Sequence, residues 1–308
     1  MDLNAFEKKK VSRFMMVAAT MIWGITFIAQ SEGAKHIEPF FFNAARFWIG
    51  ALVILPISYL RSKKDTGKST FWVASDNKMI TIKGAFFDSI AIFLGVSLQQ
   101  IGIAYTTPGK AAFLVSLSIV FVPIIGMFLG EKIKSLQWVG VFTAVVGVSL
   151  ISLNEQLQIN VGDFMMIGSA FFLAINTIVS GYYNKTVESL KYTLIRFVFA
   201  AIICTIISFL TETTNLEMVK NALPSILFAG IISSGVGYTL QSIAQINLDD
   251  LTTALILSLE SVFGAVFAWI LLGQVLSFKE LAGCVIVFCS VIYIQLIDGK
   301  EIKLTQLI

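Results

Sequence analysis

Four ionisable side chains lie inside long apolar stretches of this sequence, at Glu260, Asp88, Arg46 and Arg196. A charge at the centre of a membrane helix costs about 2.5–3.5 kcal/mol on insertion scales, so each of these residues is a candidate for function. Glu260 lies about 14 Å along its apolar run at 1.5 Å per residue, close to the middle. A carboxyl group held away from water there can exchange a proton or pair with a substrate ammonium. The alternative is a glutamate that only hydrogen-bonds a neighbouring helix.

The other three charges lie nearer the ends of their apolar runs. For Asp88 we expect a solvated acid or one paired with Lys83, with a role in coupling as the alternative. Long basic side chains near helix ends commonly extend to the headgroups. We therefore expect Arg46 and Arg196 to do so, or to bind carbonyl groups of neighbouring helices. A clamp for a substrate carboxylate is the alternative, and it would suit amino acids.

Uncharged polar and aromatic side chains in the same runs are candidates for a substrate-binding surface. An amide inside a bilayer needs a partner, which either another helix or a polar substrate can provide. Gln99 and Gln241 are such amides. Trp23 can line the bottom of a cavity, or it can pack against other apolar side chains as aromatic residues commonly do. We predict that substrate is bound by Trp23, Gln99, Tyr105, Ser116, Tyr238, Gln241 and Glu260.

The sequence carries no motif for a metal, a cofactor or a nucleotide. It has one histidine, and its three cysteines lack the spacing of metal ligands. It contains no GxxxxGK[ST] loop for nucleotide phosphates. We therefore expect no metal, no cofactor and no ATP hydrolysis. The formal net charge of +3 gives no support to nucleic-acid binding.

Long apolar helices must position these residues. Hydrophobic residues make up 56% and charged residues 13% of the 308 residues, against about 45–50% and about 25% in soluble domains. A run of about 20 apolar residues crosses a bilayer as a helix. We predict an all-α polytopic membrane protein with ten such helices, at Phe14–Gln30, Pro39–Leu60, Gly84–Tyr105, Ala111–Gly130, Leu136–Leu153, Val161–Tyr183, Leu190–Leu210, Leu223–Ile243, Leu251–Leu272 and Phe278–Ile297.

The sequence consists of two similar halves. The stretch Gly95–Glu131 recurs as Gly237–Gln274, a shift of 142 residues (95 to 237), and the earlier spans match at a shift of 150 (46 to 196). We predict a first five-helix repeat over residues 1–154 and a second over 155–308. Because five is odd, the two repeats would have opposite orientations in the membrane. Many secondary transporters have this plan, with the binding site between the halves.

Basic residues predict the orientation, because Lys and Arg are retained in short cytoplasmic loops. The N-terminal segment and the connections on its side of the membrane hold most of the Lys and Arg. We expect a multi-pass protein of the cell (cytoplasmic) membrane with both termini in the cytosol and a solvated cytosolic loop at Arg61–Lys78. The stretch Ser233–Gly237 is the weakest helical segment, and we expect a hinge there.

A series of short motifs runs along the whole chain in a fixed order, at Trp23-Gly24-Ile25-Thr26-Phe27, Ala45-Arg46-Phe47, Gly102–Thr106, Leu129-Gly130-Glu131, Gln137-Trp138-Val139-Gly140 and Leu259-Glu260. In this order they resemble the EamA-type transporters of the drug/metabolite transporter superfamily. The sequence departs from that family at Ser261, where proline is common, and at Gly273-Gln274, where Gly-Glu is common. The resemblance implies ten helices, a central cavity open to one side at a time, and transport of small metabolites, often export.

We expect a secondary transporter that exports a small polar or amphipathic metabolite, such as an amino acid or related compound, by alternating access. Proton exchange at Glu260 could couple the cycle. The expected partners are a small-molecule substrate and the lipid bilayer, and a homodimer is left open. Two other classes stay open. A scaffold or sensor subunit would tolerate loss of the cavity's polar groups, and a membrane-embedded transferase would need a cluster of Asp, His or Lys.

Overall fold

The computed structural model of the chain describes residues 5–66, 72, 77–106, 108–152, 160–273 and 277–305. These residues form helices and no strands. The first half contains α1 (Ala5–Gly33), α2 (Pro39–Thr66), α3 (Lys78–Gly102), η1 (Ile103–Tyr105), α4 (Pro108–Ser116), α5 (Ser118–Phe128) and α6 (Ser135–Ser152). The second contains α7 (Val161–Thr186), α8 (Ser189–Thr211), α9 (Leu216–Leu227), η2 (Phe228–Gly237), α10 (Tyr238–Gln245), α11 (Asp250–Leu257), α12 (Leu259–Leu272) and α13 (Phe278–Thr305).

Within the described ranges, eight helical segments are long and apolar enough to cross a membrane. They include α4 with α5, α9 through α10, and α11 with α12, each pair or series counted as one segment. The apolar part of α6 is shorter, and α13 is not among the eight. The chain is therefore a multi-pass membrane protein, whereas the full set of ten spans stays a prediction.

Short polar residues set several helix ends. Asn160 and Asp163 form a capping box at the start of α7, in which each side chain accepts from the other residue's backbone N–H. Asp249 caps α11 by accepting from a backbone N–H of its first turn at 2.7 Å. Gly130 and Gly273 follow α5 and α12 with φ of +92° and +68°. Only glycine adopts such angles without strain, so both helices end sharply there.

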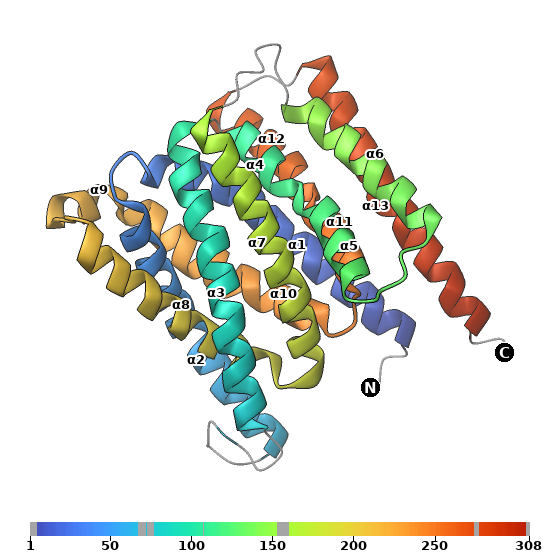
Figure 1. Cartoon of the computed structure of the whole chain (residues 1–308), viewed down its shortest axis with the longest axis horizontal. Coiled ribbons are helices and arrows are strands. Elements are labelled where there is room, and N and C mark those ends of the chain that lie inside the picture. The colour runs from blue at the N-terminus through green and yellow to red at the C-terminus, as the bar shows by residue number, and fades with distance from the viewer. Residues whose placement is uncertain are drawn as a thin grey trace.

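The largest contacts join helices from opposite halves of the chain. They pair α2 with α8 and η2, α3 with α7 and α8, α6 with α13, and α1 with α12 (Figure 1). Two glycines allow α6 and α13 to touch: a Cβ added to Gly147 would lie 2.9 Å from the Gly283 carbonyl oxygen, and one added to Gly283 would lie 2.6 Å from that of Gly147. The start of α1 and the end of α13 lie at the same end of the bundle.

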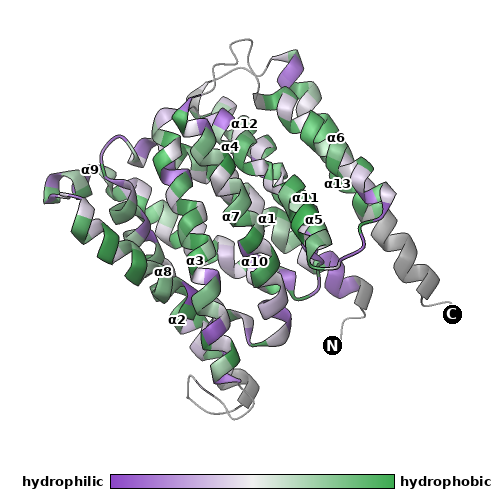
Figure 2. Cartoon of the chain, viewed as in Figure 1, coloured by the Kyte–Doolittle hydropathy of each residue, from purple (hydrophilic) through white to green (hydrophobic). Residues whose placement is uncertain are grey.

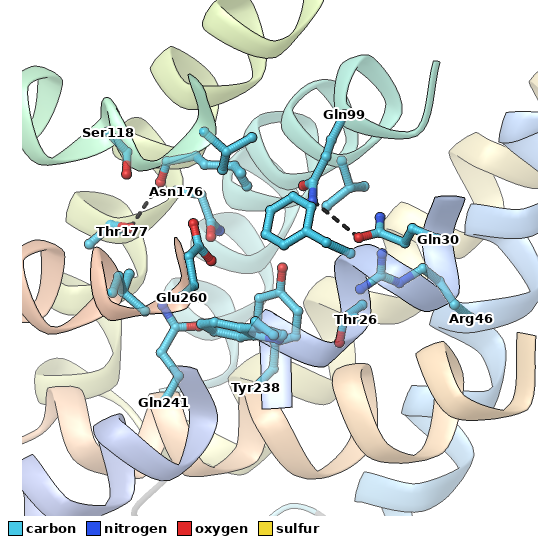
Figure 3. A pocket seen from close by; sticks show the side chains of 16 residues that line it. Thr26, Gln30, Arg46, Gln99, Ser118, Asn176, Thr177, Tyr238, Gln241 and Glu260 are labelled. Atoms are coloured by element: carbon cyan, nitrogen blue, oxygen red, sulfur yellow. Dashed lines mark hydrogen bonds between the residues drawn. The ribbon is translucent and has the colours of Figure 1, made fainter. Parts of the chain in front are cut away.

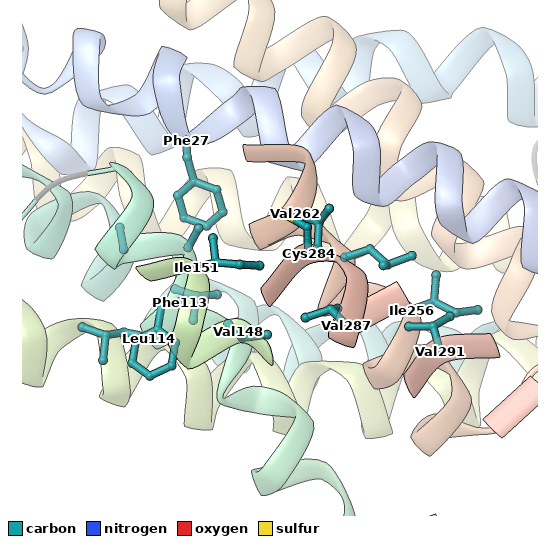
Figure 4. Packing of buried hydrophobic residues seen from close by; sticks show 14 of the residues in the cluster. Phe27, Phe113, Leu114, Val148, Ile151, Ile256, Val262, Cys284, Val287 and Val291 are labelled. Carbon is teal, nitrogen blue, oxygen red and sulfur yellow. The ribbon is translucent and has the colours of Figure 1, made fainter. Parts of the chain in front are cut away.

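Apolar side chains cover the length of the helices and also fill the core. In Figure 2 the hydrophobic residues run along the helices, and hydrophilic residues gather near helix ends and connections. Large side chains such as Phe128 and Phe209 are 87% and 88% exposed, as expected where they face lipid. The principal core cluster joins both halves: Phe27 and Phe113 lie with Val262 and Val287 (Figure 4).

Three sequence predictions fall largely outside the described residues. The loop expected at Arg61–Lys78 is one, because α2 continues to Thr66 and residues 67–71 and 73–76 are not described. The boundary expected between residues 154 and 155 and the position of Gln274 are the others.

Candidate functional site

A cavity lies in the interior of the bundle, between helices of both halves (Figure 3). It has a volume of about 60 Å³. Since a water molecule needs about 10–15 Å³ on this measure, the cavity holds only a few waters, and the helices must separate to admit a larger molecule. It is lined by Trp23, Thr26, Phe27, Gln30, Arg46, Val96, Gln99, Val115, Ser118, Leu173, Asn176, Thr177, Tyr238, Gln241, Leu257 and Glu260.

Three interruptions of α-helical geometry border this cavity. The α-helix is interrupted at Leu117, between α4 and α5. A second interruption lies at Ser258, between α11 and α12 and two residues before Glu260. The ten residues of η2 form a π-helix that ends directly before Tyr238. This π-helix contains the stretch that the sequence predicted to be weakly helical. Such segments are frequent at functional sites, because they re-aim side chains and loosen the helix.

Glu260 is the acid that lines the cavity. It lies in the first turn of α12 and is 8% exposed, so its carboxyl group is enclosed by protein yet open to the cavity. Ser116 of α4 is its polar neighbour, although the Ser116 hydroxyl itself donates to the Ala112 carbonyl at 2.8 Å. The carboxyl group is therefore available to a proton or to a cationic ligand.

Amide and aromatic side chains form the rest of the polar lining. Gln99 donates to the side-chain oxygen of Gln30 at 3.1 Å, and Gln30 donates to Gln100 at 3.1 Å. The Trp23 and Tyr238 rings pack with centroids 4.9 Å apart. Trp23 Nε1 and Gln241 Oε1 are enclosed and have no hydrogen-bond partner among the described residues. These two atoms can therefore donate to and accept from a bound molecule.

Arg46 is the cation that lines the cavity, and it does not extend to the membrane surface as the sequence led us to expect. It is 3% exposed, and its Nε and Nη2 donate to the hydroxyl groups of Ser234 at 3.1 Å and Ser233 at 3.2 Å. Its partners are thus hydroxyls of the π-helix rather than carbonyl groups. Sequence could not reveal this contact, because the residues lie almost 190 positions apart.

Asp88 and Arg196 form a buried ion pair beside the cavity. Asp88 accepts from Arg196 Nη1 at 2.8 Å, from the Tyr192 hydroxyl at 2.6 Å and from Asn176 Nδ2 at 2.7 Å. Both charged side chains are 0% exposed. The expectation of a solvated or Lys83-paired Asp88 was therefore wrong, as was that of an Arg196 that extends to the headgroups. The partners of Asp88 come from α7 and α8, which sequence alone does not place beside α3.

The cavity brings together five of the seven predicted binding residues. Trp23, Gln99, Tyr238, Gln241 and Glu260 line it. The other two do not line it, since Tyr105 is 62% exposed on η1 and Ser116 is a neighbour of Glu260 outside the lining. Five further polar residues line the cavity and were not predicted to bind substrate, because their only signal was polarity within an apolar run: Thr26, Gln30, Ser118, Asn176 and Thr177.

The described residues contain no group of three or more His, Cys, Asp or Glu side chains that could hold a metal ion. The cavity offers one acid, one guanidinium, several amides and three aromatic rings. This set can bind a small molecule that carries both polar and apolar groups.

Comparison with known proteins agrees with this chemistry. The model of the EamA-like transporter family matches residues 11–153 and again residues 160–296. An uncharacterized transporter of Archaeoglobus fulgidus is 28% identical over 284 residues, which cover 91% of this chain and 84% of that protein. A probable amino-acid metabolite efflux pump of Salmonella typhimurium is 23% identical over 310 residues, which cover 95% of this chain and 96% of the pump.

A solved crystal structure has the same fold, with a TM-score of 0.74 at 15% identity over 93% of this chain and 96% of that one. The family and the named relatives are transporters and not enzymes, which removes the transferase alternative. Because the two matched stretches together span most of its length, the chain belongs to the EamA-like transporter family.

Proposed function

We propose that the chain is a secondary transporter that exports an amino acid, or a related small polar or amphipathic metabolite, across the cytoplasmic membrane. The observation that carries this proposal is the buried carboxyl group of Glu260, open to an interior cavity that helices of both halves enclose. The name of the similar Salmonella protein, a probable amino-acid metabolite efflux pump, supports the substrate class and the direction.

The composition of the cavity supports two inverted five-helix repeats over residues 1–154 and 155–308. Fourteen of its sixteen lining residues fall into seven pairs, each separated by the repeat shift of 150 or 142 residues. The pairs are Trp23 with Leu173, Thr26 with Asn176, Phe27 with Thr177, Val96 with Tyr238, Gln99 with Gln241, Val115 with Leu257, and Ser118 with Glu260. A cavity on the axis that relates two repeats has this composition, and transporters of this plan bind substrate there.

Helix boundaries support the same repeat. The helices α2 and α8 begin at residues 39 and 189, α4 and α11 at 108 and 250, and α6 and α13 at 135 and 278. These shifts are 150, 142 and 143, and the last reflects the one residue by which Gly237–Gln274 is longer than Gly95–Glu131. The helix breaks at Leu117 and Ser258 and the two left-handed glycines also correspond.

In the proposed mechanism the two repeats rock around the cavity, which opens to one side of the membrane at a time. The π-helix η2 and the breaks in the helices that carry Ser118 and Glu260 provide points of bending at the level of the cavity. Proton exchange at Glu260 couples each cycle to the proton gradient. Both termini lie in the cytosol, which the common end of the bundle shared by α1 and α13 supports.

The test is counterflow and gradient-driven transport in proteoliposomes that contain the full chain and radiolabelled amino acids. Wild-type protein is expected to accelerate uptake several-fold when a pH gradient is imposed. Glu260→Gln keeps the size of the side chain and removes the exchangeable proton, so it is expected to retain counterflow while losing the response to the gradient. Ser118→Ala, at the corresponding position of the first repeat, is the matched control and keeps that response.

If Glu260→Gln responded to the gradient as wild type does, proton coupling at this residue would be wrong. If wild-type protein moved no amino acid or related metabolite in either assay, the proposed function itself would fail. A scaffold subunit would likewise move no metabolite in either assay. It would also keep its cellular phenotype after substitution of Glu260, Gln99 and Gln241.

A further inference from the structure

We propose that Arg46 binds a carboxylate group of the transported molecule, and that the substrate of this cavity is accordingly a zwitterion held between Arg46 and Glu260. The inference rests on the proposed transport function and names the substrate class of the same site. It follows from a comparison of Arg46 with Arg196, the arginine at the corresponding position of the other half (46 + 150 = 196).

Arg196 has an acid of its own chain as its partner. The Asp88 carboxylate accepts from Arg196, from the Tyr192 hydroxyl and from Asn176, and all four side chains are buried. Arg196 does not line the cavity, and its guanidinium carbon lies 5.5 Å from the centre of the Tyr238 ring. This arginine is closed off from a ligand and its charge is compensated.

Arg46 lacks each of those partners. The positions that correspond to Asp88, Tyr192 and Asn176 are Gly230, Phe42 and Thr26, which offer no acid and no phenol hydroxyl. The space beside Gly230 is filled by Ile49, whose Cβ would lie 2.6 Å from an added Cβ. A counter-ion for Arg46 therefore has to arrive from the cavity, which Arg46 lines and Arg196 does not.

The hydrogen bonds of Arg46 leave part of its guanidinium for a ligand. Nε and Nη2 donate to two hydroxyls, those of Ser234 and Ser233, and these are the hydrogen bonds that Arg46 makes within the described residues, so Nη1 is left over. The serine hydroxyls fix the orientation of the guanidinium without neutralising it. A buried charge without an opposite charge is strongly unfavourable. A guanidinium with a fixed plane and free N–H donors is also the group best suited to a carboxylate.

The second charge of the cavity decides between a plain anion and a zwitterion. Glu260 reaches the cavity from α12 while Arg46 reaches it from α2, on the other side of Tyr238 in Figure 3. A carboxylate on Arg46 and an ammonium on Glu260 would leave the loaded cavity without net charge, which favours its passage through a low-dielectric bundle. The apolar lining residues Val96, Val115 and Leu173 can then contact the side chain of an amino acid.

The test measures binding by thermal stabilisation of the purified full chain in detergent. The probes are the common amino acids, each beside its amide and its decarboxylated amine, with sodium chloride alone as a further arm. At least one amino acid is expected to bind, and its amide and amine to bind at least about tenfold more weakly, because a charge-assisted pair is lost. Arg46→Gln is expected to lose the same factor, and Arg46→Lys less.

Ser233→Asp and Ser233→Asn form the decisive pair of variants. The aspartate would place an internal carboxylate on Arg46, as Asp88 is placed on Arg196, and is expected to lower affinity for amino acids at least about tenfold. The asparagine has the same size and no charge, so its loss is expected to be about threefold or less. Melting curves without ligand show whether each variant is folded.

Four results would overturn the inference. The first is an amine that binds as tightly as its amino acid, and the second is wild-type affinity for amino acids in Arg46→Gln or Ser233→Asp. Either result would exclude the carboxylate site and leave the proposed transport function standing. Stabilisation by chloride alone, with no amino acid adding to it, would assign Arg46 to an inorganic anion. If no amino acid bound at all, the proposed substrate class would fall and the carboxylate site with it.

Discussion

The same substitution should destabilise the protein to very different extents at the two arginines that occupy corresponding positions, Arg46 and Arg196. Arg196→Gln leaves the Asp88 carboxylate buried without a cation, and breaking one side of a buried ion pair costs about 3–5 kcal/mol. Arg46→Gln loses two hydrogen bonds to serine hydroxyls but also removes a buried charge that has no acid beside it. We expect the second change to stay within about 1 kcal/mol, because these two effects oppose each other.

The assay is thermal denaturation of the full chain in detergent, without substrate, followed by size-exclusion chromatography. At about 2–4 °C per kcal/mol for a large domain, Arg196→Gln should lower Tm by about 6 °C or more and Arg46→Gln by less than about 4 °C. Asp88→Asn should match Arg196→Gln, and the double variant should cost less than the sum by about 1–3 kcal/mol, since the two residues are in contact. Equal losses for Arg46→Gln and Arg196→Gln would refute the difference in charge compensation between the two halves.

Three further outcomes are expected from the same protein. Gly147→Ala should lower Tm by an amount equivalent to about 1–3 kcal/mol, because its Cβ would meet the Gly283 carbonyl at 2.9 Å. Gly168→Ala in α7 is the control and should be neutral or stabilising, because the nearest atom there is the end of a leucine side chain. Similar losses of Tm in the two variants would contradict the packing of α6 on α13. Glu212→Gln should cost about 0.5–2 kcal/mol in the same melts, because its carboxylate accepts from two backbone N–H groups at the start of α2 at 2.7 Å; an unchanged Tm would show that this cap contributes nothing. Gln241→Leu should leave Tm unchanged or higher, because its side-chain oxygen is enclosed without a partner, yet reduce amino-acid transport in proteoliposomes; wild-type transport would remove Gln241 from the binding surface.

The extent of the helices could be predicted from sequence because it follows from local composition. Runs of apolar residues placed both ends of α8 to within one residue and also the start of α2, whereas α2 continues beyond its apolar run to Thr66. The breaks at Leu117 and Ser258 carried no local signal, since leucine and serine are ordinary residues within a membrane helix. The weak segment before Tyr238 was different: its glycines and serines indicated the place where the structure has a π-helix.

The site could be predicted only in part, because charge and polarity identify residues but not their partners. Glu260 and Gln241 were found by their cost inside a bilayer, and both line the cavity. The fate of Asp88 depended on Tyr192 and Arg196, more than 100 residues away, so sequence neighbours such as Lys83 gave a wrong partner. Thr26 and Asn176 also line the cavity but were not predicted, although they occupy corresponding positions of the two repeats.

The two repeats line the cavity with residues at corresponding positions, and this arrangement affects how a molecule can be oriented inside it. A cavity with two identical sides would bind one molecule in two orientations, related by a rotation of half a turn. The two orientations would have the same binding free energy. Here one repeat contributes Glu260 where the other contributes Ser118, and of the corresponding pair Arg46 and Arg196 it is Arg46 that lines the cavity. A bound molecule with two chemically different ends consequently has a single best orientation in this cavity.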